Sequence, residues 1–101
     1  MKEREWAMIP ITARKGDFRA ARSLVVEALK ETVGKGYNRE PYTASYVSRD
    51  QARKEGYSGD EPFYEVQLTA SEARRFWDAA KSIAARDGWS GVPCDIYMPD
   101  W

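Results

Sequence analysis

Apolar residues in this chain follow two different spacings, and the order in which these spacings alternate restricts the folds that the chain can adopt. Residues 63–68, FYEVQL, alternate with a period of two, which is typical of a strand with one buried face. Three further short runs, at residues 6–13, 42–48 and 92–98, are apolar or rich in β-branched and aromatic residues. We therefore expect four strands.

Two segments between these runs have the apolar spacing of an amphipathic helix. The first covers roughly residues 17–33 and is expected to stop at Gly34. The second follows a capping box with Thr69 at the N-cap and Glu72 at N3, and is expected to end at Asp87-Gly88. The expected apolar stripes are Phe18, Ala21, Leu24, Val25, Ala28 and Leu29 in the first helix and Ala73, Phe76, Trp77, Ala80, Ile83 and Ala84 in the second.

The predicted order is strand, helix, strand, strand, helix, strand, within a single domain over residues 1–101. This order predicts an α+β fold, a βαββαβ ferredoxin-like sandwich with two helices on one face of a four-stranded, mostly antiparallel sheet. That fold usually places its first strand in the centre. Pro10 cannot donate to a sheet ladder, so it predicts a bulge or an edge position for the first strand, and the strand order stays open.

The sheet face away from the helices is expected to carry the working surface. Alternation predicts an apolar and aromatic patch with acidic groups on that face, made of Trp6, Met8, Tyr46, Phe63, Glu65, Gln67, Asp95 and Tyr97. Exposed patches of this type are typical of interfaces. The alternative is that the chain covers these aromatics itself, with Trp101 or with the turn-rich segment 49–62, in which residues 50–55 could form a helical turn. A loop of that length is also typical of functional loops.

The composition argues against several kinds of chemistry. Lys plus Arg and Asp plus Glu are 16 each, so no overall attraction to nucleic acid or to an anionic membrane is expected. The chain has no histidine, which removes the commonest general base and zinc ligand. Cys94 is its single cysteine, and we expect it to be buried and inert. We predict no catalytic residues, no metal site, no cofactor and no enzymatic activity.

The leading hypothesis is a cytoplasmic protein-binding domain. Small domains without catalytic motifs are common among phage and mobile-element proteins that inhibit a larger host complex, including anti-CRISPR proteins. The alternatives are a homodimeric α+β barrel that binds a small molecule, and a weak nucleic-acid binder that uses its basic residues. No membrane partner is expected. The expected partner-binding residues are Trp6, Tyr46, Phe63, Glu65, Asp95 and Tyr97 on the sheet face, with Arg49, Arg53, Lys54 and Tyr57 from the loop. The basic clusters are Arg14, Lys15, Arg19 and Arg22, and Arg49, Arg53 and Lys54.

Overall fold

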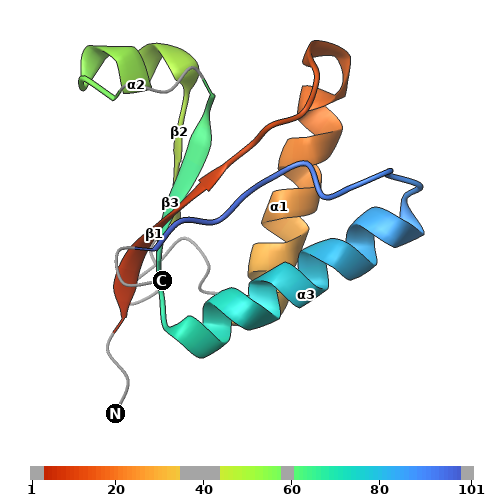
Figure 1. The fold of residues 1–101 in the computed structure, drawn as a ribbon. Helices are drawn as coiled ribbons and strands as arrows, with labels where there is room; N and C mark the ends of the chain where they lie inside the picture. The colour runs from red at the N-terminus through yellow and green to blue at the C-terminus, as the bar shows by residue number, and fades with distance from the viewer. Residues whose placement is uncertain (1–3, 35–43, 58–60, 99–101) are drawn as a thin grey trace.

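Within the part of the chain that the structure describes, three strands form an antiparallel sheet in the order β1-β3-β2, and three α-helices accompany it (Figure 1). The computed structural model describes residues 4–34, 44–57 and 61–98. The fold is therefore α+β, as predicted. Its elements are β1 (Glu5–Pro10), the 3₁₀ turn η1 (Lys15–Asp17), α1 (Phe18–Val33), β2 (Ala44–Val47), α2 (Arg49–Lys54), β3 (Phe63–Leu68) and α3 (Ala70–Arg86).

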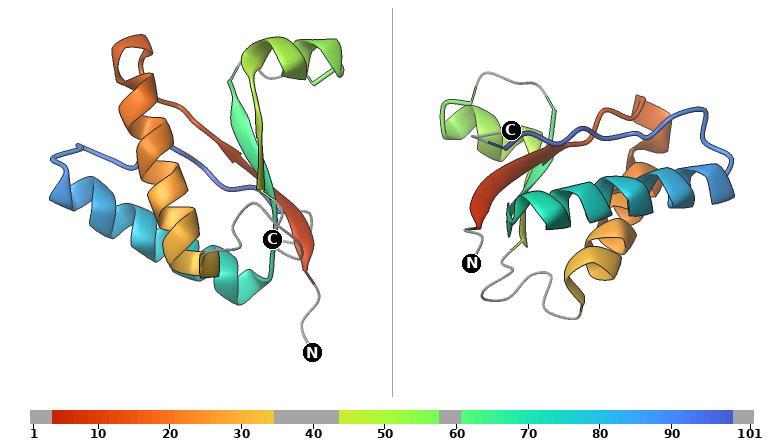
Figure 2. Two further views of the ribbon diagram at one scale, coloured as in Figure 1. Left: turned by 180° about the vertical axis from the view of Figure 1, so that it is seen from behind. Right: turned by 60° about the horizontal axis from the view of Figure 1, so that its bottom comes forward.

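Helices α1 and α3 lie on one face of the sheet and pack against each other (Figures 1 and 2). The main core fills the space between them and the sheet, and it includes Phe76, Leu29 and Ile9, which are fully buried. The two predicted apolar stripes are confirmed, because all of their members are buried or pack against this core. We call this side of the sheet the inner face. No helix in the part of the chain that the structure describes is long and apolar enough to cross a membrane.

The predicted capping box begins α3. The Thr69 hydroxyl accepts a hydrogen bond from the Glu72 amide at 3.1 Å, and the Thr69 amide donates to Glu72 Oε1 at 2.9 Å. Glu72 is buried and also pairs with Arg4, which precedes β1. The cap therefore stabilises the start of α3 and ties it to the beginning of the chain.

We expect Thr69→Ala to lower the free energy of unfolding by about 1 kcal/mol, because the Glu72 amide loses its acceptor at the helix terminus. Chemical denaturation would measure the loss. The matched control is Ser71→Ala, an exposed position in the same turn, which should change stability by no more than about 0.5 kcal/mol. Equal effects at the two positions would contradict a capping role for Thr69.

The predicted last strand is present only as two isolated bridges. Residues 92–98 run antiparallel to β1 on the side away from β3, with bridges at Met8↔Tyr97 and Ile11↔Cys94. Met8 and Tyr97 exchange two backbone hydrogen bonds, of 2.9 and 2.8 Å. The sheet thus has three strands, and the expected four-stranded ferredoxin-like sandwich is not confirmed.

Two prolines account for the weak pairing of this segment. The Asp95 amide donates to the Pro10 carbonyl at 3.0 Å, but Pro10 has no N–H to return the bond. The Thr12 amide donates to the Pro93 carbonyl at 3.1 Å, and Pro93 likewise cannot donate back. In an antiparallel ladder each of these pairs would otherwise exchange two bonds.

The structure confirms one of the two alternatives predicted from Pro10, because β1 lies at an edge of the three-stranded sheet. Strand β1 pairs with β3 in unbroken register from Glu5↔Leu68 to Pro10↔Phe63, so there is no bulge. Residues 92–98 run beside the outer edge of β1 through isolated bridges and do not form a further strand of the sheet. Pro10 is tolerated because its nitrogen faces the irregular segment, while Ile9 and Ile11 supply the bonds toward β3.

Candidate interaction surface

One set of side chains shares the outer face of the sheet, opposite α1 and α3. Cross-strand neighbours project to the same side of a sheet. Trp6 stands opposite Gln67, and Met8 stands opposite Glu65 on one side and Tyr97 on the other. The predicted outward positions of these five residues are therefore confirmed by the register.

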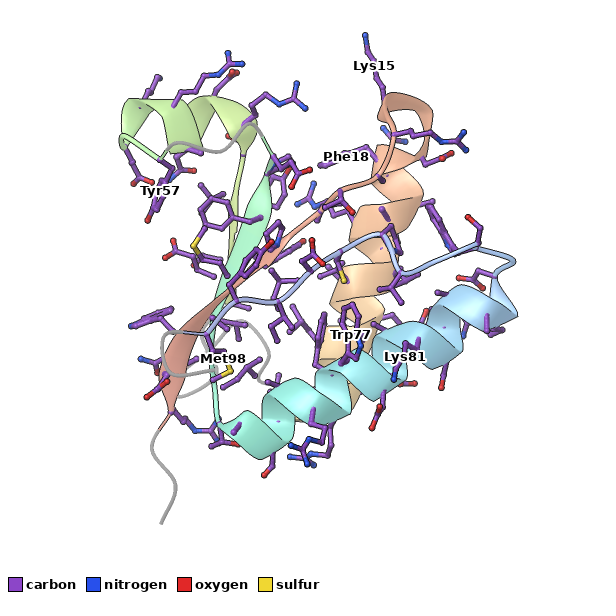
Figure 3. The ribbon with its side chains drawn as sticks, viewed as in Figure 1. Lys15, Phe18, Tyr57, Trp77, Lys81 and Met98 are labelled. Carbon is purple, nitrogen blue, oxygen red and sulfur yellow. The ribbon has the colours of Figure 1, made fainter. Side chains whose placement is uncertain are left out.

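Helix α2 covers one end of the outer face. Its Ala52 is buried in a small second cluster with Val47 and Phe63, against which Met8 packs. Tyr57 lies just beyond α2 (Figure 3). Its ring meets the Phe63 ring edge-on, with 5.2 Å between their centroids. Phe63 is only 3% exposed. The prediction that Phe63 is an exposed contact residue is wrong, because α2 and Tyr57 pack over it.

The other end of the outer face carries exposed aromatic side chains. Trp6 is 50% exposed and Tyr97 59%. The exposed Asp95 lies on the same face but stands opposite Pro10, nearer the end that α2 covers. Among the residues that the structure describes, only Trp6, Tyr97 and Tyr57 are large, hydrophobic and exposed. All three lie on the outer face or at its border with α2. We call Trp6, Tyr97, Asp95, Glu65 and Gln67 the open patch.

The structure places Tyr46 on the inner face, so its predicted place in the open patch is wrong. Strand β2 pairs with β3 so that Tyr46 stands opposite Tyr64, with 5.3 Å between the ring centroids. The Arg22 guanidinium lies 4.1 Å from the Tyr46 ring centroid. Burial raises the pKa of the Tyr46 phenol, and the charge of Arg22 partly opposes that rise.

The expected basic residues of the loop stand on α2. Ser48 caps this helix by accepting a hydrogen bond from the Gln51 amide at 3.2 Å, and Arg49, Arg53 and Lys54 are all exposed. Arg49 also lines a hollow that lies beside the start of α1. Tyr57 therefore lies at the border of the outer face, whereas Arg49 lies near the start of α1.

The two carboxylates of the open patch are not neighbours on the sheet. Glu65 is on β3 and Asp95 is in the segment on the far side of β1. With one strand between them and an offset of two residues along it, their backbones are roughly 12 Å apart at ordinary strand spacing. Within residues 4–34, 44–57 and 61–98, no three Cys, Asp or Glu side chains gather as metal ligands.

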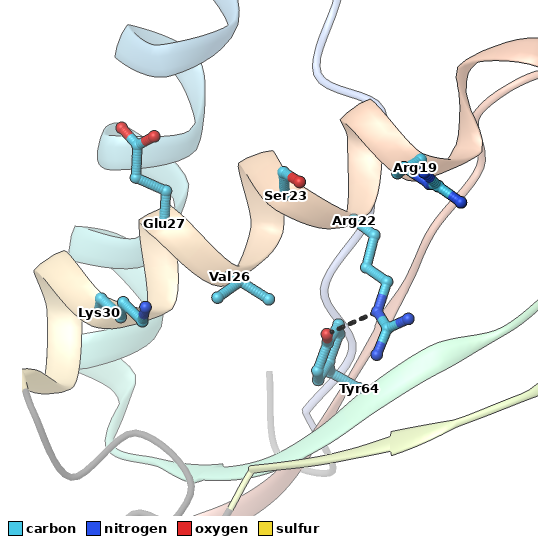
Figure 4. A pocket seen from close by; sticks show the side chains of 7 residues that line it. All are labelled: Arg19, Arg22, Ser23, Val26, Glu27, Lys30 and Tyr64. Carbon is cyan, nitrogen blue, oxygen red and sulfur yellow. Dashed lines mark hydrogen bonds between the residues drawn. The ribbon is translucent and has the colours of Figure 1, made fainter.

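Two hollows lie beside α1 toward the sheet, and neither was expected from the sequence. One has a volume of about 550 Å³ (Figure 4) and is lined by Arg19, Arg22, Ser23, Val26, Glu27, Lys30 and Tyr64. The other, of about 610 Å³, is lined by Ala13, Lys15, Phe18, Tyr46, Ser48, Arg49, Asp50 and Pro62. The recurrence of Arg19, Arg22, Val26 and Lys30 at helical spacing is the sequence signal that could have indicated a shared face.

No known family, curated protein or solved structure matches this chain. The choice of a working surface therefore depends on the geometry of its own residues.

Cys94 is buried against the main core, as predicted. Burial, with a smaller contribution from the charge of Asp95, raises the pKa of its thiol to about 12. The thiol therefore stays protonated through the neutral range, and a thiol is a far weaker nucleophile than a thiolate. This position supports packing and not chemistry.

We expect Cys94 in the folded protein to react with a thiol-specific reagent at pH 8 at least about a hundred times more slowly than in denaturant, because both access and thiolate formation are suppressed. Absorbance from a chromogenic disulfide reagent would follow the reaction. A native rate equal to the denatured rate would contradict the burial of this side chain.

Proposed function

We propose that this chain is a small, non-catalytic protein-binding domain that docks on a larger protein through the open patch. The supporting observation is that the exposed large hydrophobic side chains of the described residues, Trp6, Tyr57 and Tyr97, all lie on or beside one sheet face. Tryptophan and tyrosine are enriched among the residues that dominate binding energy at interfaces. Covering them on a partner removes apolar surface from water.

The chemistry of the open patch favours a basic partner surface. Asp95 and Glu65 place carboxylates on the same face as the Trp6 and Tyr97 rings. An arginine side chain of a partner would be attracted both by an aromatic face and by a carboxylate. The proposed contact is therefore a partner surface that presents arginine or lysine among apolar groups.

We place this binding activity in the class of phage or mobile-element inhibitors that act on a larger host complex, of which anti-CRISPR proteins are examples. The small size of the domain, at 101 residues, supports this class. A cytoplasmic setting is part of the proposal and fits the unpaired thiol of Cys94. A ferredoxin-like βαββαβ arrangement also belongs to the proposal, supported by residues 92–98 running antiparallel beside β1.

The geometry gives less support to a homodimeric barrel. Such a barrel would need two outer faces to meet over their full width. Helix α2 and Tyr57 stand over one end of this face and would separate two copies there. Sedimentation equilibrium at micromolar concentration should therefore give a monomer of 11.6 kDa; a stable dimer would favour the barrel instead.

Affinity capture tests the proposed function. The tagged chain would be incubated with bacterial lysates, and retained proteins would be identified by mass spectrometry. A specific partner should be retained by the native chain and by the control Arg74→Ala/Arg75→Ala, which changes two exposed residues of α3. It should be lost with Trp6→Ala/Tyr97→Ala. Retention by all three proteins would show that the open patch is not the docking surface.

A further inference from the structure

The two hollows beside α1 adjoin a single pair of stacked side chains. Arg22 lines the first hollow and Tyr46 lines the second, and the guanidinium of Arg22 lies over the Tyr46 ring. The Phe18 ring, one helical turn before Arg22 on α1, also lies near this pair, 6.4 Å from Tyr46 between centroids. The hollows therefore follow one another along α1, and we call them together the α1 groove.

Arg22 is held in a fixed orientation at the middle of the α1 groove. Its Nε donates a hydrogen bond to the Tyr64 hydroxyl at 3.1 Å (Figure 4), while its guanidinium plane lies 4.1 Å from the Tyr46 ring centroid. A guanidinium held in this way loses little conformational entropy when a ligand binds. The aromatic rings thus position a cation at the junction of the two hollows.

The α1 groove is cationic although the whole chain has no net charge. It is lined by five basic residues, Lys15, Arg19, Arg22, Lys30 and Arg49, and by two acidic ones, Glu27 and Asp50. The Glu27 carboxylate pairs with both terminal nitrogens of Arg86, at 2.9 and 3.2 Å, so part of its charge is neutralised. The α1 groove therefore carries an excess of positive charge. The open patch, a separate surface, carries carboxylates instead.

From Phe18 to Lys30 the groove follows about 18 Å of helix, at 1.5 Å per residue. A single nucleotide or phosphate could not reach cations spread over that length. A chain with regularly spaced negative charges could contact them in succession. Planar groups gather around the cation in the middle of the groove, namely the Phe18, Tyr46 and Tyr64 rings near the Arg22 guanidinium.

We infer that the α1 groove binds single-stranded nucleic acid, independently of the protein-binding function proposed for the outer face. Grooves that bind single strands without sequence preference combine cations along the backbone with aromatic or guanidinium planes next to the bases. The cations at Arg19, Arg22 and Arg49 contact phosphates, and bases enter the hollows on either side of the Arg22–Tyr46 pair. Zero net charge makes the binding weak and dependent on low salt.

Fluorescence anisotropy with a dye-labelled 20-nucleotide oligo(dT) tests this inference on the whole chain. At 50 mM salt we expect a Kd of about 10⁻⁶–10⁻⁴ M, with log K falling by about 0.7 for each neutralised phosphate per unit of log salt. The variant Arg19→Gln/Arg49→Gln should bind at least about tenfold more weakly and should flatten the salt slope by about 1.4. Both positions are exposed, so the fold should survive both changes.

The control Arg74→Gln/Arg75→Gln makes the same charge change on α3, at residues that do not line either hollow. It should leave both the affinity and the slope within about twofold of the native chain. Equal losses in the two variants would overturn the inference, as would the absence of binding at 50 mM salt. A poly-glutamate chain or a duplex of the same length that binds as tightly as oligo(dT) would also overturn it, because the groove would then recognise charge alone or a double helix.

Discussion

Replacing Phe63 with alanine is expected to lower the free energy of unfolding by about 3–5 kcal/mol, the usual cost of removing a buried phenylalanine. The side chain is only 3% exposed and fills the cluster between the sheet and α2. A domain of this size has a total stability of about 5–15 kcal/mol, so the variant should be close to unfolding. Guanidinium denaturation followed by circular dichroism would measure the loss.

Trp6→Ala is the matched control on the same face of the sheet. Trp6 is half exposed, so its removal should cost no more than about 1 kcal/mol. A cost for Phe63→Ala as small as that for Trp6→Ala would mean that α2 does not cover this end of the face. Because it damages the fold, Phe63→Ala is also unsuitable as a probe of binding.

The second large effect is expected at the open patch. Once a partner is purified, Trp6→Ala and Tyr97→Ala should each weaken binding by about 2 kcal/mol, which is roughly thirtyfold, because central aromatic side chains dominate interface energies. Calorimetric titration would give both values. The effects should combine to at least a hundredfold loss, and dissociation should become faster while association changes little.

Tyr57→Ala provides a graded comparison. Tyr57 lies at the border with α2 and is less exposed than Tyr97, so its effect should be smaller, below about 1 kcal/mol, as is usual for residues at the rim of an interface. A larger loss at Tyr57 than at Trp6 would move the docking surface onto α2, where Arg53 and Lys54 are exposed.

The elements with strong local signals were predictable from the sequence. Strand β3 occupies the expected residues 63–68, because strict alternation and flanking turn residues define a strand locally. Helix α3 begins at the expected capping box at Thr69 and ends at Asp87, its C-cap, before Gly88, which has a positive φ of 80°. In each case the deciding interactions join residues close together in the sequence.

The faces of the aromatic residues could not be predicted in the same way. Whether Tyr46 points inward depends on the register between β2 and β3, which is set by pairing with Tyr64 and not by the residues around Tyr46. Phe63 alternates outward as expected, yet α2 covers it through a contact with Ala52. Burial of this kind is a tertiary property, and period-two alternation reports only the side of the sheet.

The irregular pairing of residues 92–98 with β1 could be explained only once the residue opposite each proline was known. Both prolines can be read from the sequence. The effect of Pro93 on the pairing, however, depends on its position opposite Thr12, and the effect of Pro10 depends on its position opposite Asp95. Each proline removes one ladder bond at a different pair. The α1 groove was likewise hidden, since it combines α1 residues with Arg49 and Tyr46, which are distant in the sequence.

Hydroxyl-radical footprinting of the purified complex tests the central claim most directly, since it reports the solvent access of individual aromatic side chains. In the free protein Trp6 and Tyr97, at 50% and 59% exposure, should be oxidised readily. Binding of the partner should protect both, by at least about fivefold for side chains fully buried at the centre of an interface, while Trp89, which lies beyond α3, keeps its rate. Unchanged oxidation of Trp6 and Tyr97 in the complex would contradict the assignment of the open patch as the docking surface.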